Sequence, residues 1–273
     1  MASETAPHDV PVRDASTVVL LRDTPGGIEV FLQRRVAGMA FAGGMTVFPG
    51  GGVDASDAES EVAWAGPEVG WWAERFAVDE AKARALVCAA ARETFEECGV
   101  LLAGPDADTV VSDSSRYSGA RSQLEKRELS FSTFLRNENL VLRSDLLRPW
   151  ANWITPVGEG TRRYDTRFFV AAAPEGQKAD GATSEAAEVL WRTPEQELEH
   201  WLSGGSMLLP PTWSQLKALT EYRTVEEVLA QSPEIPAILP TMITDEDRIR
   251  VEFPGQDGYY DAGPHPWDSR SAK

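Results

Sequence analysis

The order of apolar and polar residues predicts a chain in which short strands and helices are mixed. Runs of β-branched and apolar residues bounded by turn residues indicate strands. Such runs cover residues 16–21, 28–32, 45–48, 149–156, 166–171, 187–191 and 248–253. Helical patterns cover residues 81–98, 123–137, 194–202, 211–222 and 225–231, whereas residues 104–120 resemble a loop. Strands mixed with helices in this way are compatible with an α/β (α+β) fold.

The chain of 273 residues can bury a sizeable core. We expect a flexible polar N-terminus over residues 1–14 and one domain over residues 15–235. An insertion is expected at about residues 55–83, and a C-terminal extension at residues 236–273. Cys88 and Cys98 lie on one predicted helix, about 15 Å apart by helical rise. A disulfide requires Cα atoms within about 7 Å, so both are expected to be free packing residues.

Charge and composition restrict the class of partner. The chain is 42% hydrophobic and 25% charged, which is typical of soluble proteins, and its net charge is −17. Such a charge opposes binding to nucleic acids and anionic membranes. No apolar run is long enough for a membrane span, the N-terminus lacks a signal-peptide core, and the last residues form no peroxisomal tripeptide. We therefore expect a cytoplasmic protein that binds a small molecule. A homodimer is one option for its assembly.

Three carboxylates lie on one face of the predicted helix over residues 81–98. Glu93, Glu96 and Glu97 stand at positions i, i+3 and i+4 and repel one another. A hard divalent cation such as Mg²⁺ would turn this repulsion into a binding site, because it prefers oxygen ligands. A solvated acidic helix face is the alternative interpretation of the three glutamates alone.

The residues around these glutamates resemble a known motif. Residues 92–100 (RETFEECGV) are similar to the second half of the Nudix box, G-x5-E-x7-R-E-U-x-E-E-x-G-U, in which U is apolar. Residues 47–54 (VFPGGGVD) resemble the glycine loop that opens the box. Gly51 and Arg92 are 41 positions apart where the pattern has 14, so 27 residues are inserted. With the insertion placed between Asp54 and Arg84, Arg84 stands where the family has its first glutamate.

Two further segments, residues 163–169 and 209–213, resemble the coenzyme A diphosphatase branch of the Nudix family. The resemblance implies a mixed β-sheet between α-helices. It also implies an Mg²⁺- or Mn²⁺-dependent hydrolase that cleaves the diphosphate bond of a nucleoside diphosphate linked to another group. For the branch this would be coenzyme A or acyl-CoA, which would yield adenosine 3′,5′-bisphosphate and a 4′-phosphopantetheine compound.

The resemblance also implies roles for individual residues. The Gly51 carbonyl, Glu93, Glu96 and Glu97 would ligate metal, and Arg92 would orient the glutamates through ion pairs. The remaining implied residues are Gly50 and Gly52, which allow close approach to phosphate, and a later carboxylate, Glu185 in preference to Glu188, as general base or further ligand.

Basic residues could hold the substrate phosphates by bidentate contacts. The candidates are Arg34 and Arg35, before the glycine loop, and the cluster Arg162, Arg163 and Arg167. Structural ion pairing is the alternative role for each arginine.

The inserted segment carries Trp64, Trp71 and Trp72 among acidic residues. These side chains could pack on the body of the protein, form a dimer contact or form a wall of the substrate pocket. Two other functions remain open at this point. One keeps the chemistry but changes the substrate to ADP-ribose, a dinucleotide or a nucleotide sugar. The other is a nucleotide-binding Nudix fold without catalysis.

Overall fold

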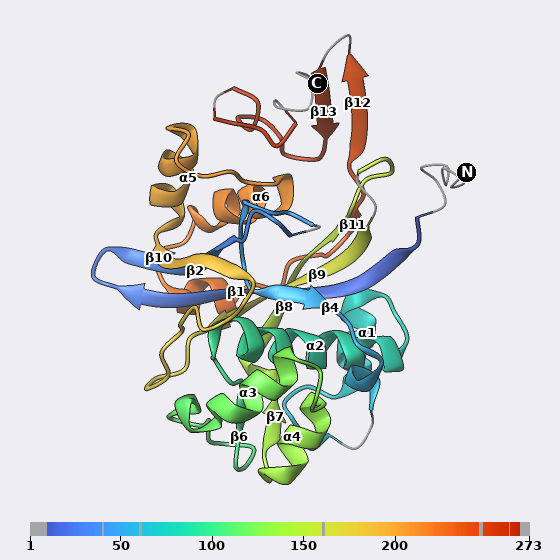
Figure 1. The fold of residues 1–273 in the computed structure, drawn as a ribbon, viewed down its shortest axis with the longest axis vertical. Coiled ribbons are helices and arrows are strands. Elements are labelled where there is room, and N and C mark those ends of the chain that lie inside the picture. Colours follow the sequence, from blue (N-terminus) through green and yellow to red (C-terminus); the bar gives the residue numbers. More distant parts are fainter. Residues whose placement is uncertain are drawn as a thin grey trace.

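A mixed β-sheet forms the centre of the protein in the computed structural model (Figure 1). The structure describes residues 10–39, 41–59, 62–159, 162–245, 248–261 and 263–267. The strand order is β10-β2-β1-β9-β8-β11, with β3 beside β2 and β4 beside β1. The strands of this sheet are β1 (Val12–Thr24), β2 (Gly27–Arg35), β3 (Thr46–Val47), β4 (Gly50–Gly52), β8 (Leu147–Ile154), β9 (Arg163–Ala172), β10 (Ala186–Arg192) and β11 (Ala237–Ile238).

Parallel and antiparallel pairs both occur in the sheet. β1 runs parallel to β9 and antiparallel to β2, and β8 runs antiparallel to β9. There are two smaller sheets among the described residues. One contains β5 (Trp64–Ala65), β6 (Ala103–Gly104) and β7 (Val141–Arg143). The other contains β12 (Thr241–Asp245) and β13 (Arg248–Glu252). The helices are α1 (Val69–Phe76), α2 (Glu80–Cys98), α3 (Ser118–Glu125), α4 (Phe131–Asn137), α5 (Pro194–Leu202), α6 (Pro210–Leu219) and α7 (Val225–Leu229), with short 3₁₀ turns at Ala55–Ala58, Ser114–Tyr117 and Ser144–Leu146.

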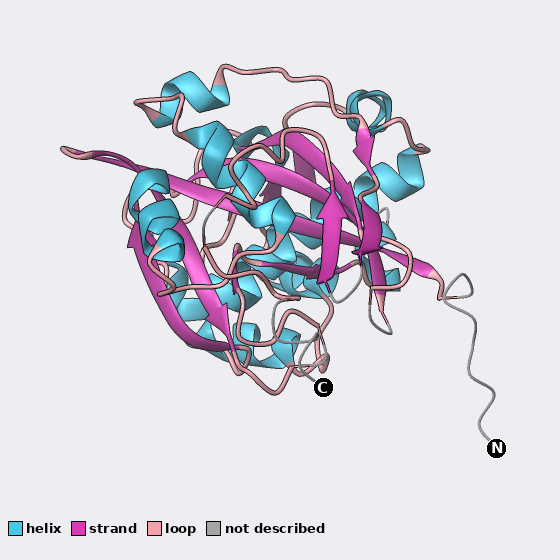
Figure 2. Cartoon of the chain, turned by 90° about the horizontal axis from the view of Figure 1, so that it is seen from above, coloured by secondary structure: helices cyan, strands magenta, loops and turns pink. Residues whose placement is uncertain are grey.

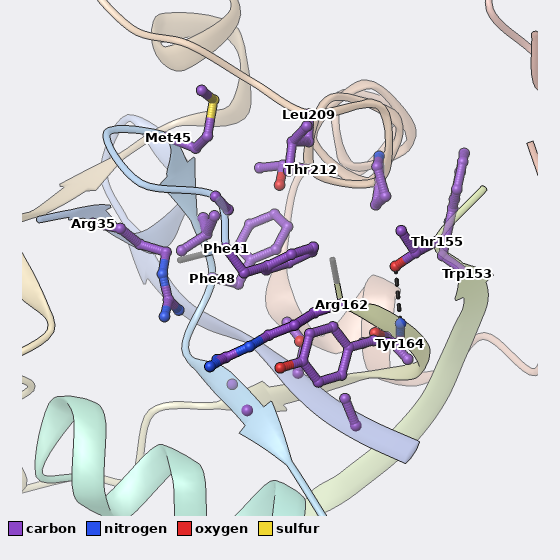
Figure 3. A pocket seen from close by; sticks show the side chains of 18 of the residues that line it. Arg35, Phe41, Met45, Phe48, Trp153, Thr155, Arg162, Tyr164, Leu209 and Thr212 are labelled. Carbon is purple, nitrogen blue, oxygen red and sulfur yellow. Dashed lines mark hydrogen bonds between the residues drawn. The ribbon is translucent and has the colours of Figure 1, made fainter. Parts of the chain in front are cut away.

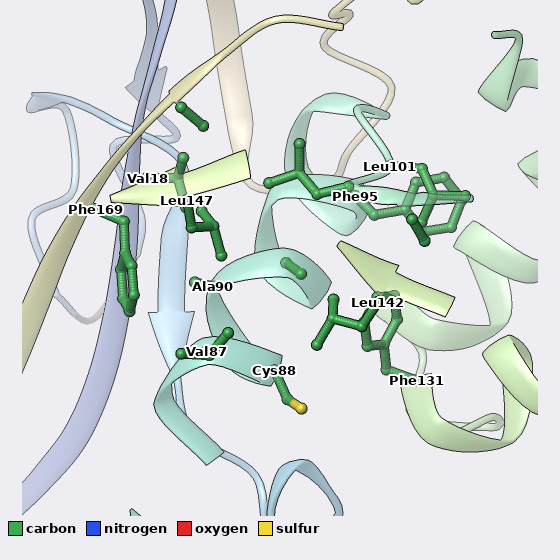
Figure 4. Close-up of a cluster of buried hydrophobic side chains, with 14 of the residues drawn as sticks. Val18, Val87, Cys88, Ala90, Phe95, Leu101, Phe131, Leu142, Leu147 and Phe169 are labelled. Carbon is green, nitrogen blue, oxygen red and sulfur yellow. The ribbon is translucent and has the colours of Figure 1, made fainter. Parts of the chain in front are cut away.

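Helices cover both faces of the sheet, as Figures 1 and 2 show. Successive strand residues point to opposite faces, so β1 contributes to two cores. Val18 and Leu20 pack in the cluster formed with α1 to α4, part of which is drawn in Figure 4. Val19 and Leu21 pack in the cluster formed with α5, α6, α7 and the β12–β13 hairpin. The predicted fold class, a mixed sheet between helices, is confirmed.

Helix α2 lies against the sheet and carries the three glutamates. Asp79 caps its first turn by accepting a hydrogen bond from the Lys82 amide. The helix ends at Cys98, because Gly99 adopts a left-handed conformation with φ 74° that suits glycine. Small side chains fill much of its buried surface, and Cys88 and Cys98 are both buried and free, as predicted.

The predicted helix over residues 123–137 is wrong, because two helices occupy this region. α3 begins earlier, within the segment predicted as a loop, and ends at Glu125. Arg127 has φ 58°, which interrupts the helical backbone, and Ser130 caps the new helix α4 by accepting from the Thr133 amide. The apolar pattern continues through the break, which is why it did not mark the boundary.

The inserted segment folds onto the body of the protein. Trp72 in α1 is fully buried and packs against Phe76 of the same helix and Phe169 of strand β9. Trp64 is partly buried and donates to a backbone carbonyl, whereas Trp71 is 38% exposed. None of the three lines the cavity described below, so the interpretation as a pocket wall is wrong.

The segment after residue 236 is also part of the compact structure. β11 extends the main sheet beside β8, and Val251, Phe253 and Trp267 are buried in the second core cluster. β1 begins at Val12, inside the segment predicted as flexible, and residues 1–9 lie outside the described residues. The division into domains stays a prediction. Within the part of the chain that the structure describes, no helix is long and apolar enough to cross a bilayer.

Candidate active site

The glycine strand β4 lies between β1 and the glutamate face of α2. Gly51 pairs with Ser16 across the antiparallel ladder. A Cβ atom at Gly51 would lie 2.6 Å from the carboxylate of Glu93, and one at Gly50 would lie 2.5 Å from the Ser16 carbonyl. Only glycine fits at position 50, because the contact there is with backbone, whereas a side chain at position 51 would displace the Glu93 carboxylate from the strand.

Glu97 is held at this junction by two donors. Its Oε2 accepts hydrogen bonds from the Gly50 amide at 2.7 Å and from Gln33 Nε2 at 2.6 Å. The nearest cation is Arg35, whose Nη1 lies 4.0 Å from Oε1. Burial, together with the charge of Glu93, raises the pKa of Glu97 to about 8.

The two other glutamates contact Arg92. Glu93 accepts from Arg92 Nη1 at 2.7 Å, and Glu96 accepts from the same atom at 3.3 Å. Burial raises the pKa of Glu93 to about 7 despite Arg92, and burial also raises the pKa of Glu96. Glu93 and Glu97 line the cavity, whereas Glu96 does not. The structure therefore brings two of the three predicted carboxylates to one surface.

Arg92 joins the helix to the glycine strand. Its Nε and Nη2 donate to both carboxylate oxygens of Asp57 at 2.9 and 2.8 Å, and Nη2 also donates to the Gly52 carbonyl at 2.8 Å. Burial opposes its charge, but Glu93 and Asp57 raise the pKa of Arg92 above its ordinary value. This buried network suits the orienting role that the resemblance implies.

Asp57 corrects the predicted position of the insertion. It lies six residues after Gly51, which is where the box pattern has its first glutamate. Its bidentate pair with Arg92 shows that the insertion follows Asp57 rather than Asp54. Arg84 does not occupy the acidic position and instead lies over the ring of Trp64. The spacing from Gly51 was visible in the sequence, but only the Arg92 contact identifies the partner.

The two candidate carboxylates of the later loop have different surroundings. Glu185 lines the cavity and accepts from Arg35 Nη2 at 2.7 Å. Glu188 is 55% exposed, pairs with Arg34 at 3.2 Å and does not line the cavity. Only Glu185 is therefore placed to act with Glu97.

The candidate arginines divide by the side of the strand on which they lie. On β9, Tyr164, Thr166 and Phe168 line the cavity. Arg163 and Arg167 alternate with them and are buried away from it. Arg163 donates to the Thr155 carbonyl, and Arg167 pairs with Asp165. Arg34, Arg163 and Arg167 thus lie outside the cavity, whereas Arg35 and Arg162 line it.

The cavity has a volume of about 540 Å³, and part of its lining is drawn in Figure 3. Its lining residues fall into two chemical groups, which we call the acidic end and the apolar end. The acidic end contains Glu93, Glu97 and Glu185 with the glycine strand. The other end is largely apolar and is lined by Met39, Phe41, Met45, Phe48, Trp153, Leu209, Val251 and Trp267. Sequence reasoning missed this second wall, because its residues come from five separate segments.

The acidic end has the donor chemistry for a hard divalent cation. Glu93 and Glu97 both face the cavity beside the Gly51 backbone, and all the donors are oxygen atoms. Their raised pKa values show that two buried negative charges here lack sufficient compensation from the protein. Among the described residues, no three His, Cys, Asp or Glu side chains converge as a complete protein-only metal set. Backbone, water or substrate oxygens would complete the coordination, which is the usual mode for Mg²⁺.

These pKa values predict how the stability of the metal-free protein depends on pH. A carboxyl whose pKa is higher in the folded protein than in the unfolded chain stabilises the fold while protonated. The contribution is complete below pH 4.5 and is lost as pH rises through about 7 for Glu93 and about 8 for Glu97. We expect the free energy of unfolding in chelator to fall by on the order of 5 kcal/mol between pH 5.5 and 8.5.

Urea unfolding at both pH values would measure this loss. Mg²⁺ should restore stability at pH 8.5 more than at pH 5.5. The matched control is the double variant Glu93→Gln/Glu97→Gln, whose stability should vary less with pH. An equal pH dependence of the variant and the natural protein would contradict the assignment.

A glycine strand set against a glutamate helix beside a mixed sheet defines a Nudix hydrolase, a class that generally uses divalent metals. A solved Nudix hydrolase from Alicyclobacillus acidocaldarius has a similar fold, with a TM-score of 0.67 and 28% identity. The similarity covers 84% of this chain and 100% of that one.

Residues 74–219 match the family model described as the NUDT19 Nudix domain, and the chain belongs to this family. Its similar relatives include two proteins named acyl-coenzyme A diphosphatase NUDT19. The Xenopus laevis protein is 26% identical over 85% of this chain and 71% of its own length. The Gallus gallus protein is 26% identical over 90% of this chain and 79% of its own length. The predicted enzyme class, a hydrolase of phosphorus-containing anhydrides, is confirmed.

Proposed function

We propose that this enzyme hydrolyses the diphosphate of coenzyme A or an acyl-CoA, with Mg²⁺ or Mn²⁺ as cofactor. The observation that supports the substrate is the cavity, which joins the carboxylates of α2 to a largely apolar wall. Coenzyme A combines a diphosphate with a long, weakly polar thiol arm, so one molecule matches both ends. The names of the Xenopus laevis and Gallus gallus relatives point to the same substrate class.

The acidic end would carry the chemistry. The Gly51 carbonyl, Glu93 and Glu97 would hold metal, whereas the third predicted glutamate ligand, Glu96, lies outside the cavity and contacts Arg92. When bound, such ions neutralise a diphosphate and lower the pKa of a coordinated water. The residues around them have positioning roles. Arg92 fixes Glu93 and Glu96, and Gly50 allows the close approach of β4 to β1. Gly52, where a Cβ atom would meet nothing within 4 Å, would leave room for phosphate beside the strand.

Glu185 would act as the general base, because it is the later-loop carboxylate in the cavity. Its pair with Arg35 holds it near Glu97, which Arg35 also approaches. In the reaction, water oxygen bonds to one phosphorus and the bridging P–O bond breaks, so each product keeps one of the two phosphates of the former diphosphate. The proton of the attacking water would pass to Glu185.

The apolar end would hold the thiol arm. This corrects the expectation that the tryptophans of the insertion supply the groove, since the lining comes from residues 39–48, 209–212 and the segment after 236. The net charge of −17 disfavours nucleic acids as substrates. A cytoplasmic location and a homodimer stay predictions.

The test compares coenzyme A, an acyl-CoA, ADP-ribose and NADH as substrates with Mg²⁺, Mn²⁺ or chelator, and identifies products by mass. We expect metal-dependent release of adenosine 3′,5′-bisphosphate, with the coenzyme A compounds preferred. Preference for ADP-ribose or NADH would keep the chemistry and overturn the substrate. Absence of cleavage of all four would favour a nucleotide-binding Nudix protein.

A further inference from the structure

The cations that line the cavity are not equivalent. Arg35 pairs with Glu185 at 2.7 Å, and Arg127 lies 3.7 Å from Asp54. Arg162 also lines the cavity and is exposed. Among the described residues it has no ion pair or hydrogen bond, although the chain has 43 acidic residues for 26 basic ones. An unpaired guanidinium in so acidic a protein is available for an anion from solution.

The position of Arg162 follows from the alternation of β9. It lies one residue before the strand. In the alternation of side chains it falls on the same side as Tyr164 and Thr166, which line the cavity. Its neighbour Arg163 falls on the opposite side of the strand and is buried. Figure 3 shows the Arg162 side chain extending past the Tyr164 ring toward the glycine strand β4.

The acidic residues that line the cavity together with Arg162 already have partners. Glu93, Glu97, Glu159 and Glu185 are the acidic lining residues, and each of them has a hydrogen bond or an ion pair. The Tyr164 ring packs edge-on against Phe41, which fixes that side of the cavity. A phosphate placed between β4 and Arg162 would meet a planar donor that can form two parallel hydrogen bonds.

We propose that Arg162 binds a phosphate group of the substrate and is the specificity-determining arginine of this cavity. The inference rests on the proposed function for the identity of the substrate, but the anion site itself does not. The phosphate is either part of the diphosphate or the additional 3′-phosphate of coenzyme A. Both present anionic phosphoryl oxygens to the guanidinium.

Binding and turnover of the variants Arg162→Ala and Arg162→Lys would test the proposal. Loss of a charge-assisted bidentate contact should raise KM by about 10- to 100-fold in Arg162→Ala, with kcat changed much less. Arg162→Lys keeps the charge but loses the planar fork, so an intermediate KM is expected. Arg34→Ala is the matched control, because Arg34 is exposed and lies outside the cavity; its KM should stay within twofold.

Coenzyme A and 3′-dephospho-coenzyme A distinguish the two phosphates. An equal rise of KM for both compounds assigns Arg162 to the diphosphate, and a rise for coenzyme A alone assigns it to the 3′-phosphate. An unchanged KM for both in a folded Arg162→Ala variant would overturn the proposal. Arg162 is exposed, so thermal unfolding should show a native-like midpoint.

A binding measurement separates this inference from the proposed function. Calorimetry with adenosine 3′,5′-bisphosphate and with ADP, in chelator, does not require turnover. We expect the affinity for at least one of these anions to be about tenfold or more lower in Arg162→Ala than in the natural protein. This result would support the site even if no coenzyme A compound is cleaved. Equal affinity of the two proteins for both anions would contradict it.

Discussion

Replacement of Glu97 by glutamine is expected to lower kcat by about 10³-fold or more while the fold is retained. Glu97 faces the cavity beside Glu93 and the glycine strand. Glutamine keeps the shape and the carbonyl oxygen that accepts from Gly50, but it removes the negative charge that would bind a cation. A loss of about 4 kcal/mol of transition-state stabilisation corresponds to this factor.

The measurement is the turnover of coenzyme A at saturating Mg²⁺ for the natural protein and the variant. Glu188→Gln is the matched control, because it makes the same chemical change at an exposed position outside the cavity. The thermal midpoint of Glu97→Gln in chelator should equal or exceed that of the natural protein, since one buried charge is removed. Unchanged kcat in Glu97→Gln would refute the metal assignment.

Replacement of Arg92 by methionine is expected to destabilise the protein by about 3–5 kcal/mol. The Arg92 side chain is 6% exposed and compensates the charges of Asp57 and Glu93. Methionine keeps much of the apolar stem but leaves these carboxylates buried without a cation, and breaking a buried pair in this way is costly. The loss should be largest at high pH, where both carboxylates must ionise.

Urea unfolding at pH 8 would measure the loss. Arg34→Met is the control, because the Arg34–Glu188 pair is about half exposed and should contribute less than 1 kcal/mol. The additional substitution Asp57→Asn should recover part of the stability of Arg92→Met, because it removes one of the uncompensated charges. A loss for Arg92→Met no greater than that for Arg34→Met would contradict the role of this network.

The sequence alone determined the helix that carries the glutamates and the class of the enzyme. Helix α2 was predicted within one residue of each end, because its small residues, its cap at Asp79 and the left-handed Gly99 act locally. The i, i+3, i+4 spacing of the glutamates is likewise a property of the helix itself. The resemblance to the Nudix box depended on these same local residues and was confirmed by the family match.

The tertiary structure alone decided which residues surround the site. The partner of Arg92 is Asp57, 35 positions away in the chain, and the cavity wall includes Trp267. Among the adjacent arginines of one cluster, Arg162 faces the cavity and Arg163 does not, because a shift of one residue on a strand reverses the direction of the side chain. Local pattern determines what an element is, whereas contacts between distant segments determine which of its side chains meet.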